Sequence, residues 1–374
     1  MLLLAGLAAG CGGARPADVP RPSPASADEC VLSRGDSASG PVVAAAFGRD
    51  TVLVDPRRSR TPVGLSCTGA PLPRLASSWS ADSSRRSWTL VVPSAGAVAS
   101  YWRTDPYAAA ALRLAGATSV VPLDDHRVVV SFETPQDGVP GVLADPDLAR
   151  GPGDTAGLRR MRDIGPDLRD AVDGAADLVV TADPAVIEYA AARGDRIVRP
   201  LPWNRSYVLL LSSPRVGPDL GVGDSAAFRA SLAQEAVRVA ARPAAPPFWW
   251  EPQPVCPPSA GTRVTTSAGV AYPAGDPTAR ALAERVVAMA SGAGLRVQPV
   301  ADDALAATIG RGAWSAYVVP LPKVALVPCR WIATWPDSAV AYPLIETRST
   351  AIVRVGSPPL LIDHDGGLVP DSRR

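Results

Sequence analysis

The stretch from Gly269 to Val300, GVAYPAGDPTARALAERVVAMASGAGLRVQPV, has the clearest alternation of strand and helix signals in the chain. Its apolar first residues predict a strand over Gly269–Tyr272, and the pair Asp276-Pro277 is typical of a helix start. The glycines in Gly292–Gly294 end that helix, and Leu295–Val300 predicts a second strand. Strands joined by a helix of this length pair in parallel, which indicates an α/β fold.

The same pattern continues on both sides of this stretch. A helix is expected around Asp303–Thr308, followed by a strand over Gly312–Val319. Further strands are predicted at Val42–Phe47, Thr51–Val54, Trp88–Val92, Val128–Phe132, Asp177–Thr181 and Tyr207–Ser212. Further helices are predicted at Pro106–Ala115, Asp167–Gly174, Ala185–Arg193 and Ala226–Arg242.

The length and charge of the chain limit its class. Its 374 residues exceed the size at which a single hydrophobic core stops growing, so two lobes are expected. The formal net charge of +1 gives no electrostatic basis for binding nucleic acid.

The N-terminal residues predict export. Leu2–Cys11 reads LLLAGLAAGC, an apolar run that ends in small residues and a cysteine. This pattern resembles a bacterial lipobox, so residues 1–11 are expected to be a lipoprotein signal peptide, with Cys11 as the lipidated residue. The run is too short to span a bilayer. Residues 12–30 are expected to be a linker. The alternative to a signal peptide is an apolar N-terminus that is not cleaved.

Four further cysteines are compatible with two disulfides in an exported protein. Their order along the chain favours Cys30 with Cys67 and Cys256 with Cys329. The alternative is a set of unpaired buried thiols. Zinc is not expected, because no two cysteines have CxxC spacing and the chain has only two histidines.

Several segments, in order along the chain, resemble one protein family. They are Leu72–Trp79 (LPRLASSW) with Trp88–Leu90, His126–Phe132 (HRVVVSF), Ala176–Val180, Tyr207–Leu211, Ala271–Val287 with Gly294–Val297, and Ala341–Ile345 (AYPLI). Together they are similar to family 5 of the extracytoplasmic solute-binding proteins, the peptide- and nickel-type receptors of ABC importers. The chain resembles a shortened and divergent member.

The resemblance implies a two-lobed, type II periplasmic-binding-protein fold of the α/β class. Lobe one is expected to contain residues 31–255, with a small subdomain at about 61–135, and lobe two residues 256–341. Residues 342–374 then return to lobe one. The implied function is capture of a small solute, with peptides among the candidates, for delivery to an ABC permease. The protein is expected to be a monomer without a cofactor, lipid-anchored to the outer face of the membrane or in the periplasm.

Aromatic residues beside carboxylates are the candidate ligand contacts. Trp249, Trp250 and Glu251 lie in a Pro-rich segment where the chain is expected to cross between lobes, so they are predicted to line the cleft. The alternative is that they brace the hinge. A second aromatic and acidic group follows Cys329, and Arg205 is expected at the lobe edge. The full set of predicted ligand contacts is Trp249, Trp250, Glu251, Arg205, Trp331, Trp335 and Asp337.

An enzyme is not expected. The sequence has no GxSxG, HExxH or P-loop motif, and its two histidines offer little for a catalytic triad. His126 and His364 both lie among aspartates in polar loops.

In members of the family that bind peptides, a Trp/Asp segment lies where this chain reads Pro320-Leu321-Pro322. The competing function is therefore that of a lipoprotein that keeps the fold without transporting, with a structural or sensory role.

Overall fold

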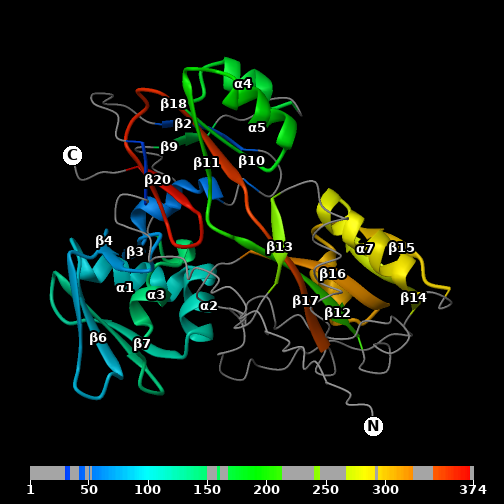
Figure 1. Ribbon diagram of the computed structural model, residues 1–374. Coiled ribbons are helices and arrows are strands. Elements are labelled where there is room, and N and C mark those ends of the chain that lie inside the picture. The colour runs from blue at the N-terminus through cyan, green and yellow to red at the C-terminus, as the bar shows by residue number, and fades with distance from the viewer. Residues whose placement is uncertain are drawn as a thin grey trace, which may run out of the picture.

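The structure is a computed structural model, and its elements are shown in Figure 1. It describes residues 30–33, 42–46, 50, 53–149, 158–160, 167–212, 240–244, 267–290, 294–322 and 340–370. Within these residues, strands and helices form an α/β protein with several separate sheets. No helix in the described residues is long and apolar enough to cross a membrane.

The largest sheet has six strands and contains the segment that the sequence identifies most clearly. Its order is β13 (Ala241–Pro243), β17 (Val340–Thr347), β12 (Arg205–Leu211), β16 (Trp314–Pro322), β14 (Ser267–Pro273) and β15 (Val297–Val300). β14 pairs in parallel with both β15 and β16, which confirms the expected parallel arrangement. The remaining pairs in this sheet are antiparallel.

Helix α7 (Pro277–Met289) covers one face of the six-stranded sheet. It begins where expected, because the Asp276 carboxylate accepts hydrogen bonds from the backbone N–H groups of Thr278 and Ala279, each at 3.0 Å. Its buried residues recur at helical spacing and pack against alternate residues of β12, β14 and β16. These buried residues are Ala279, Leu282, Ala283 and Val286. Helix α8 (Leu305–Gly310) packs on the opposite face through Leu305 and Ile309.

A five-stranded sheet is the second largest in the described part of the chain. Its order is β11 (Arg196–Pro200), β18 (Thr350–Arg354), β10 (Leu178–Thr181), β2 (Val42–Ala46) and β9 (Leu158–Arg160). β10 lies in the middle of the sheet and is buried along its whole length, as its run of apolar residues predicts. Helices α4 (Arg169–Asp173) and α5 (Pro184–Ala191) pack against this sheet (Figure 1).

A four-stranded antiparallel sheet has its own hydrophobic core. Its order is β5 (Ser78–Ala81), β6 (Ser87–Val91), β8 (Arg127–Phe132) and β7 (Ala117–Pro122). The core beneath it includes Trp88, Trp102 and Phe132 and residues of α1 (Ala95–Thr104) and α2 (Pro106–Leu114). The short helix α3 (Val139–Val142) and the 3-10 helix η4 (Pro146–Leu148) continue this core.

Two small sheets complete the described part of the chain. One pairs β3 (Val63–Leu65) with β4 (Pro71–Pro73), and the other contains β1 (Val31–Ser33), β19 (Leu360–Ile362) and β20 (Leu368–Pro370). A disulfide joins Cys30 to Cys67, as the sequence predicts, and so connects the start of β1 to the loop between β3 and β4.

Two sequence predictions are wrong within the described residues. Leu53 and Val54 lie in a 3-10 turn rather than a strand, and Asp55-Pro56 directly after them begins the 3-10 helix η3 (Pro56–Arg60). The helix expected over Ala226–Arg242 does not reach its predicted end, because Ala241 and Arg242 belong to β13 and pair with β17. Residues 226–239 lie outside the described part.

Candidate ligand-binding site at the crossover segments

Two short segments connect the five-stranded sheet to the six-stranded sheet. Leu201–Asn204 leads from β11 into β12, and Arg348–Ser349 leads from β17 into β18. The Leu201 N–H donates to the Ser349 carbonyl at 2.9 Å, and the Asn204 N–H donates to the Thr347 carbonyl at 3.3 Å. The two crossover segments therefore run side by side, and Figure 1 shows β17 continuing directly into β18.

A buried polar cluster occupies one side of the crossover segments. The Ser349 hydroxyl donates to Asp50 Oδ1 at 2.5 Å, and Arg205 Nη2 lies 3.8 Å from the same oxygen. Burial raises the pKa of Asp50, against the opposing effects of Ser349 and Arg205. The cluster thus joins a residue that follows β2 to the crossover and to the first residue of β12.

Tyr207 extends this cluster to the start of α7. Its hydroxyl donates to the Asp276 carboxylate at 3.2 and 3.1 Å, and both side chains are buried. Burial raises the pKa of Tyr207, and the charge of Asp276 adds to this effect. Burial of Arg205 acts to lower its pKa, because burial disfavours the charged form. The nearby Tyr207, Asp50 and Asp276 outweigh this effect and raise the pKa. The guanidinium therefore stays charged.

A second group of charged residues lies around Trp203. The guanidinium carbons of Arg242 and Arg348 each lie 4.6 Å from the centroid of the Trp203 ring, within the range of cation–π contacts. Arg242 Nε donates to Glu346 Oε2 at 2.7 Å across the β13–β17 pair. Glu346 pairs with Ser206 on β12, and Arg205 is the neighbour of Ser206. Glu346 and Arg205 therefore project from opposite faces of the sheet.

Of the predicted ligand contacts, only Arg205 lies in the described part of the chain. Its side chain is 16% exposed and is directed to Asp50 and Tyr207, so it stabilises the crossover rather than facing open solvent. Three sets of predicted residues lie outside the described part: the contacts Trp249, Trp250, Glu251, Trp331, Trp335 and Asp337, the cysteines Cys256 and Cys329, and the lipidation site Cys11.

The sequence does not predict that Arg242 and Arg348 lie against Trp203. Trp203 precedes the most apolar strand, which is a visible signal, but Arg242 and Arg348 have no distinguishing local pattern. They meet Trp203 because β17 pairs with both β12 and β13. Knowledge of that strand order is needed to find the cluster.

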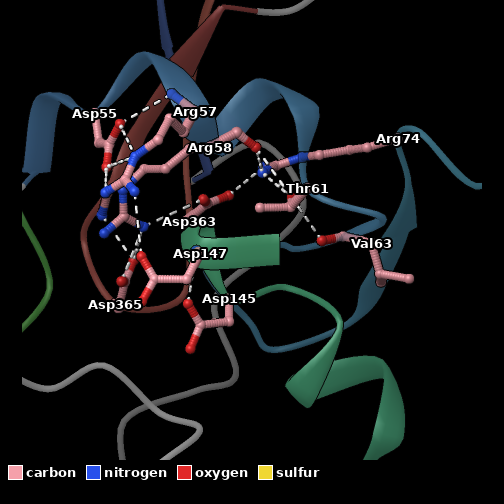
Figure 2. Close-up of polar contacts among 11 residues, drawn as sticks. Asp55, Arg57, Arg58, Thr61, Val63, Arg74, Asp145, Asp147, Asp363 and Asp365 are labelled. Atoms are coloured by element: carbon pink, nitrogen blue, oxygen red, sulfur yellow. Dashed lines mark hydrogen bonds and ion pairs between the residues drawn. The ribbon is translucent and has the colours of Figure 1, made fainter. Parts of the chain in front are cut away.

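A second buried ionic network lies around Arg58 (Figure 2). Arg58 Nη1 lies 2.9 Å from Asp365 Oδ2 and 3.6 Å from Asp363 Oδ2, and Arg74 Nη2 lies 2.6 Å from Asp363 Oδ1. Arg57 Nη1 donates to Asp147 Oδ1 at 3.1 Å. The network connects η3 with η4 and with the turn between β19 and β20, so its role is to hold these segments together.

Burial acts to raise the pKa of both Asp363 and Asp365, but their net shifts have opposite directions. Burial raises the pKa of Asp363, although Arg74 and Arg58 oppose the shift. Burial acts in the same direction on Asp365, but the Arg58 charge and the hydrogen bond from the Gly367 N–H outweigh it and lower the pKa. No three histidine, cysteine or acidic residues of the described segments are grouped so that they could hold a metal ion.

Comparisons with known proteins give a clear result for the fold alone. No family model and no curated protein sequence matches the chain. A dipeptide-binding protein from Pseudoalteromonas sp. SM9913, in complex with Met-Leu, has a similar structure with a TM-score of 0.63 and 10% identity. The alignment covers 88% of this chain and 98% of that chain.

Two further solved structures agree with this comparison. NikA from Staphylococcus aureus, in complex with Ni(L-His)2, aligns with a TM-score of 0.61 and 9% identity, over 90% of this chain and 99% of that chain. The murein tripeptide-binding protein MppA from Escherichia coli aligns with a TM-score of 0.58 and 10% identity, over 89% of this chain and 99% of that chain.

The fold is therefore that of the two-lobed, type II periplasmic binding proteins. The predicted resemblance to the peptide- and nickel-type solute-binding proteins is confirmed for the fold. The similar structures are binding proteins, and at these identities they do not identify a ligand.

Proposed function

We propose that this protein is an exported, lipid-anchored receptor that captures a small solute between two lobes and delivers it to an ABC importer. The observation that carries the proposal is the pair of adjacent crossover segments between two separately packed sheets. Such a connection allows one sheet to rotate relative to the other around a few residues. Closure of this kind surrounds a ligand with contacts from both sides.

The sheets suggest where the lobes divide. β12, β13 and β17 belong to the same sheet as β14, β15 and β16, which they join through the β12–β16 pair. A division at residues 256 and 341 would separate these two groups of strands. We therefore assign one lobe to the six-stranded sheet and the other to the five-stranded sheet with the elements around it. The division then follows the crossover segments Leu201–Asn204 and Arg348–Ser349.

The proposed solute is small and needs no cofactor for its recognition. Proteins with a similar fold bind Met-Leu and Ni(L-His)2, which makes short peptides and chelated metals suitable first probes. Trp249, Trp250 and Glu251 remain proposed cleft residues, as do Trp331, Trp335 and Asp337. Tryptophan rings offer flat apolar surfaces for a ligand, and the carboxylates accept hydrogen bonds from its donor groups.

A ligand screen tests solute capture. The soluble protein lacking residues 1–11 is screened by thermal shift against dipeptides, amino acids, sugars and chelated nickel. A ligand at about 100 times its Kd stabilises the protein by roughly 2.7 kcal/mol. Small-angle scattering then measures closure as a decrease in the radius of gyration. A screen without any stabilising solute, or a ligand that leaves the radius unchanged, contradicts the proposal.

Variants at the tryptophan pair test the proposed lining. Trp250→Ala is expected to weaken binding of the identified solute by more than about 1 kcal/mol, as the loss of an aromatic anchor often does. If Trp249→Ala and Trp250→Ala both keep the affinity but lower the melting temperature, the pair braces the hinge instead.

The membrane anchor is tested through Cys11. The Cys11→Ala protein is expected to leave the membrane fraction, because the lipid is proposed as its only attachment. If this variant still partitions with membranes without incorporating a lipid label, the lipoprotein assignment is wrong.

One structural feature favours a second function, a receptor fold used without transport. Pro320, Leu321 and Pro322 continue β16 and pair with β12, and Leu321 is buried. At the position where peptide-binding members of the family have a Trp/Asp segment, this chain therefore has residues that form part of the six-stranded sheet. Genes for a permease and an ATPase beside this gene favour import, and their absence favours the structural or sensory role.

A further inference from the structure

Three elements meet at Trp203, and two of them bring charged side chains to it. Trp203 lies in the first crossover segment, Arg348 begins the second, and Arg242 lies on β13 at the edge of the six-stranded sheet. Both guanidinium carbons lie 4.6 Å from the indole centroid. The Arg348 N–H also donates to the Ala240 carbonyl at 3.3 Å, which fixes the second crossover against the residue before β13.

The positive charge around Trp203 is incompletely balanced by the described residues. Glu346 pairs with Arg242, whose side chain is 47% exposed, whereas the Glu346 side chain is 10% exposed. No carboxylate of the described segments lies within ion-pair distance of Arg348. Two guanidinium groups therefore share one indole, and among the described residues only Arg242 has a carboxylate partner.

The Arg348 side chain is also incompletely hydrogen-bonded. Its Nε is buried and has no hydrogen-bond partner in the described part of the chain. A buried donor without a partner is costly, because the group loses its bonds to water on folding. Protein atoms cover this Nε, so an incoming carboxylate binds Arg348 through its terminal nitrogens, Nη1 and Nη2.

We propose that Trp203, Arg348 and Arg242 form a site for a carboxylate group of the solute, an inference that rests on the proposed function. Stacking on Trp203 restricts the plane of each guanidinium, and a guanidinium of fixed orientation binds a carboxylate through paired, charge-assisted hydrogen bonds. The exposure of Arg242 gives the ligand a path from solvent. A carboxylate bound here contacts both crossover segments, so its binding is coupled to the angle between the two sheets.

Matched ligands test the charge requirement. The binding of succinate and of the dipeptide Met-Leu is measured by calorimetry at constant ionic strength and compared with succinamide and the C-terminal amide of Met-Leu. At least one carboxylate is expected to bind about tenfold or more tightly than its amide, because the amide lacks the charge that a guanidinium recognises. Equal affinity within both pairs, or no binding by either carboxylate, overturns the proposal.

Matched variants test the residues. Arg348→Gln is expected to weaken the carboxylate about tenfold or more, and Trp203→Leu to weaken it because the guanidinium planes are released. Arg280→Gln is the control, since Arg280 is an exposed residue of α7 that pairs with Glu284. Circular dichroism verifies that each variant is folded, and Arg348→Lys provides a second variant that keeps the charge but loses the planar fork. Unchanged affinity in Arg348→Gln overturns the proposal.

The two proposals fail in distinguishable ways. If neutral solutes from the screen bind and close the protein while carboxylates have no advantage, solute capture stands and the carboxylate site is wrong. If carboxylate binding requires Arg348 but produces no decrease in the radius of gyration, the carboxylate site stands and solute capture by closure is wrong.

Discussion

Arg58 and Asp365 are separated by 307 positions in the sequence, yet Arg58 Nη1 lies 2.9 Å from both carboxylate oxygens of Asp365, with both side chains buried. The pair joins η3 to the turn between β19 and β20 (Figure 2). A Cβ added at Gly367 would meet the Arg58 guanidinium, so glycine at this position leaves room for the guanidinium where it lies. The sequence change with the clearest consequence is therefore one that removes this arginine.

Arg58→Met is expected to lower the free energy of unfolding by about 3–5 kcal/mol, because it leaves the buried Asp365 without its cationic partner. Urea unfolding measures the change. Arg85→Met is the control, since Arg85 and Asp137 form a pair with 61% and 75% exposure, and a change below about 0.5 kcal/mol is expected. Adding Asp365→Leu to Arg58→Met is expected to restore part of the loss. A similar cost for Arg58→Met and Arg85→Met contradicts the prediction.

His364 is expected to make stability depend on pH. Both ring nitrogens are buried without a hydrogen-bond partner in the described segments, and burial lowers the pKa of the ring despite the neighbouring Asp363 and Asp365. The unfolded state therefore binds a proton more readily than the folded state. Stability is retained above about pH 6.5 and falls as the pH decreases from there, by no more than about 1.4 kcal/mol per pH unit.

Unfolding measured between pH 7.5 and 5.5 tests this dependence. The variant His364→Phe is expected to flatten the profile, and the difference from the unmodified protein isolates the contribution of His364. His126→Gln is the matched control, because His126 is the other histidine of the chain and lies exposed in a turn. A profile that keeps its slope in His364→Phe rules out the assignment.

The disulfides make a separate prediction about stability. Replacing Cys30 and Cys67 by serine opens a loop with a sequence separation of 37, for which chain entropy suggests a loss of about 4 kcal/mol in the free energy of unfolding. Peptide mapping without reduction is expected to find Cys30–Cys67 and also Cys256–Cys329, which lies outside the described residues. Free thiols at Cys256 and Cys329 would refute the second pairing.

The parts of the fold that the sequence predicts correctly are those with local causes. The Asp-Pro cap and the helical spacing of Ala279, Leu282 and Val286 are contained within α7 itself. Helix α1 is missing from the prediction, although Ala95, Val98, Ala99 and Trp102 have the same spacing of buried positions. Its residues are small, and the single polar residue at its N-terminus, Ser94, is a weaker signal of a helix start than an Asp-Pro pair.

The candidate site is harder to predict because its parts are distant in sequence. The strand register aligns Arg242 with Glu346, and the second crossover segment then brings Arg348 to Trp203. The position of Arg205 before an apolar strand is visible in the sequence, but its contact with Asp50 depends on the packing of two sheets. A charged residue at a strand end has the same local pattern whether it binds a ligand or a neighbouring carboxylate.

The buried helix cap at Asp276 supplies the last prediction. Its carboxylate accepts two backbone N–H groups of α7 and the Tyr207 hydroxyl, whereas the exposed Asp183 accepts the Ala185 N–H at the start of α5. Asp183→Ala is expected to cost about 1 kcal/mol, a usual value for the loss of a cap. Asp276→Ala is expected to cost about 1–3 kcal/mol more, because it also leaves the buried Tyr207 hydroxyl without this acceptor. Adding Tyr207→Phe to Asp276→Ala should then recover part of the loss, and urea unfolding of the three variants measures it. Equal costs for the two aspartates, or no recovery in the double variant, would show that the Tyr207 contact contributes nothing to the stability of the crossover.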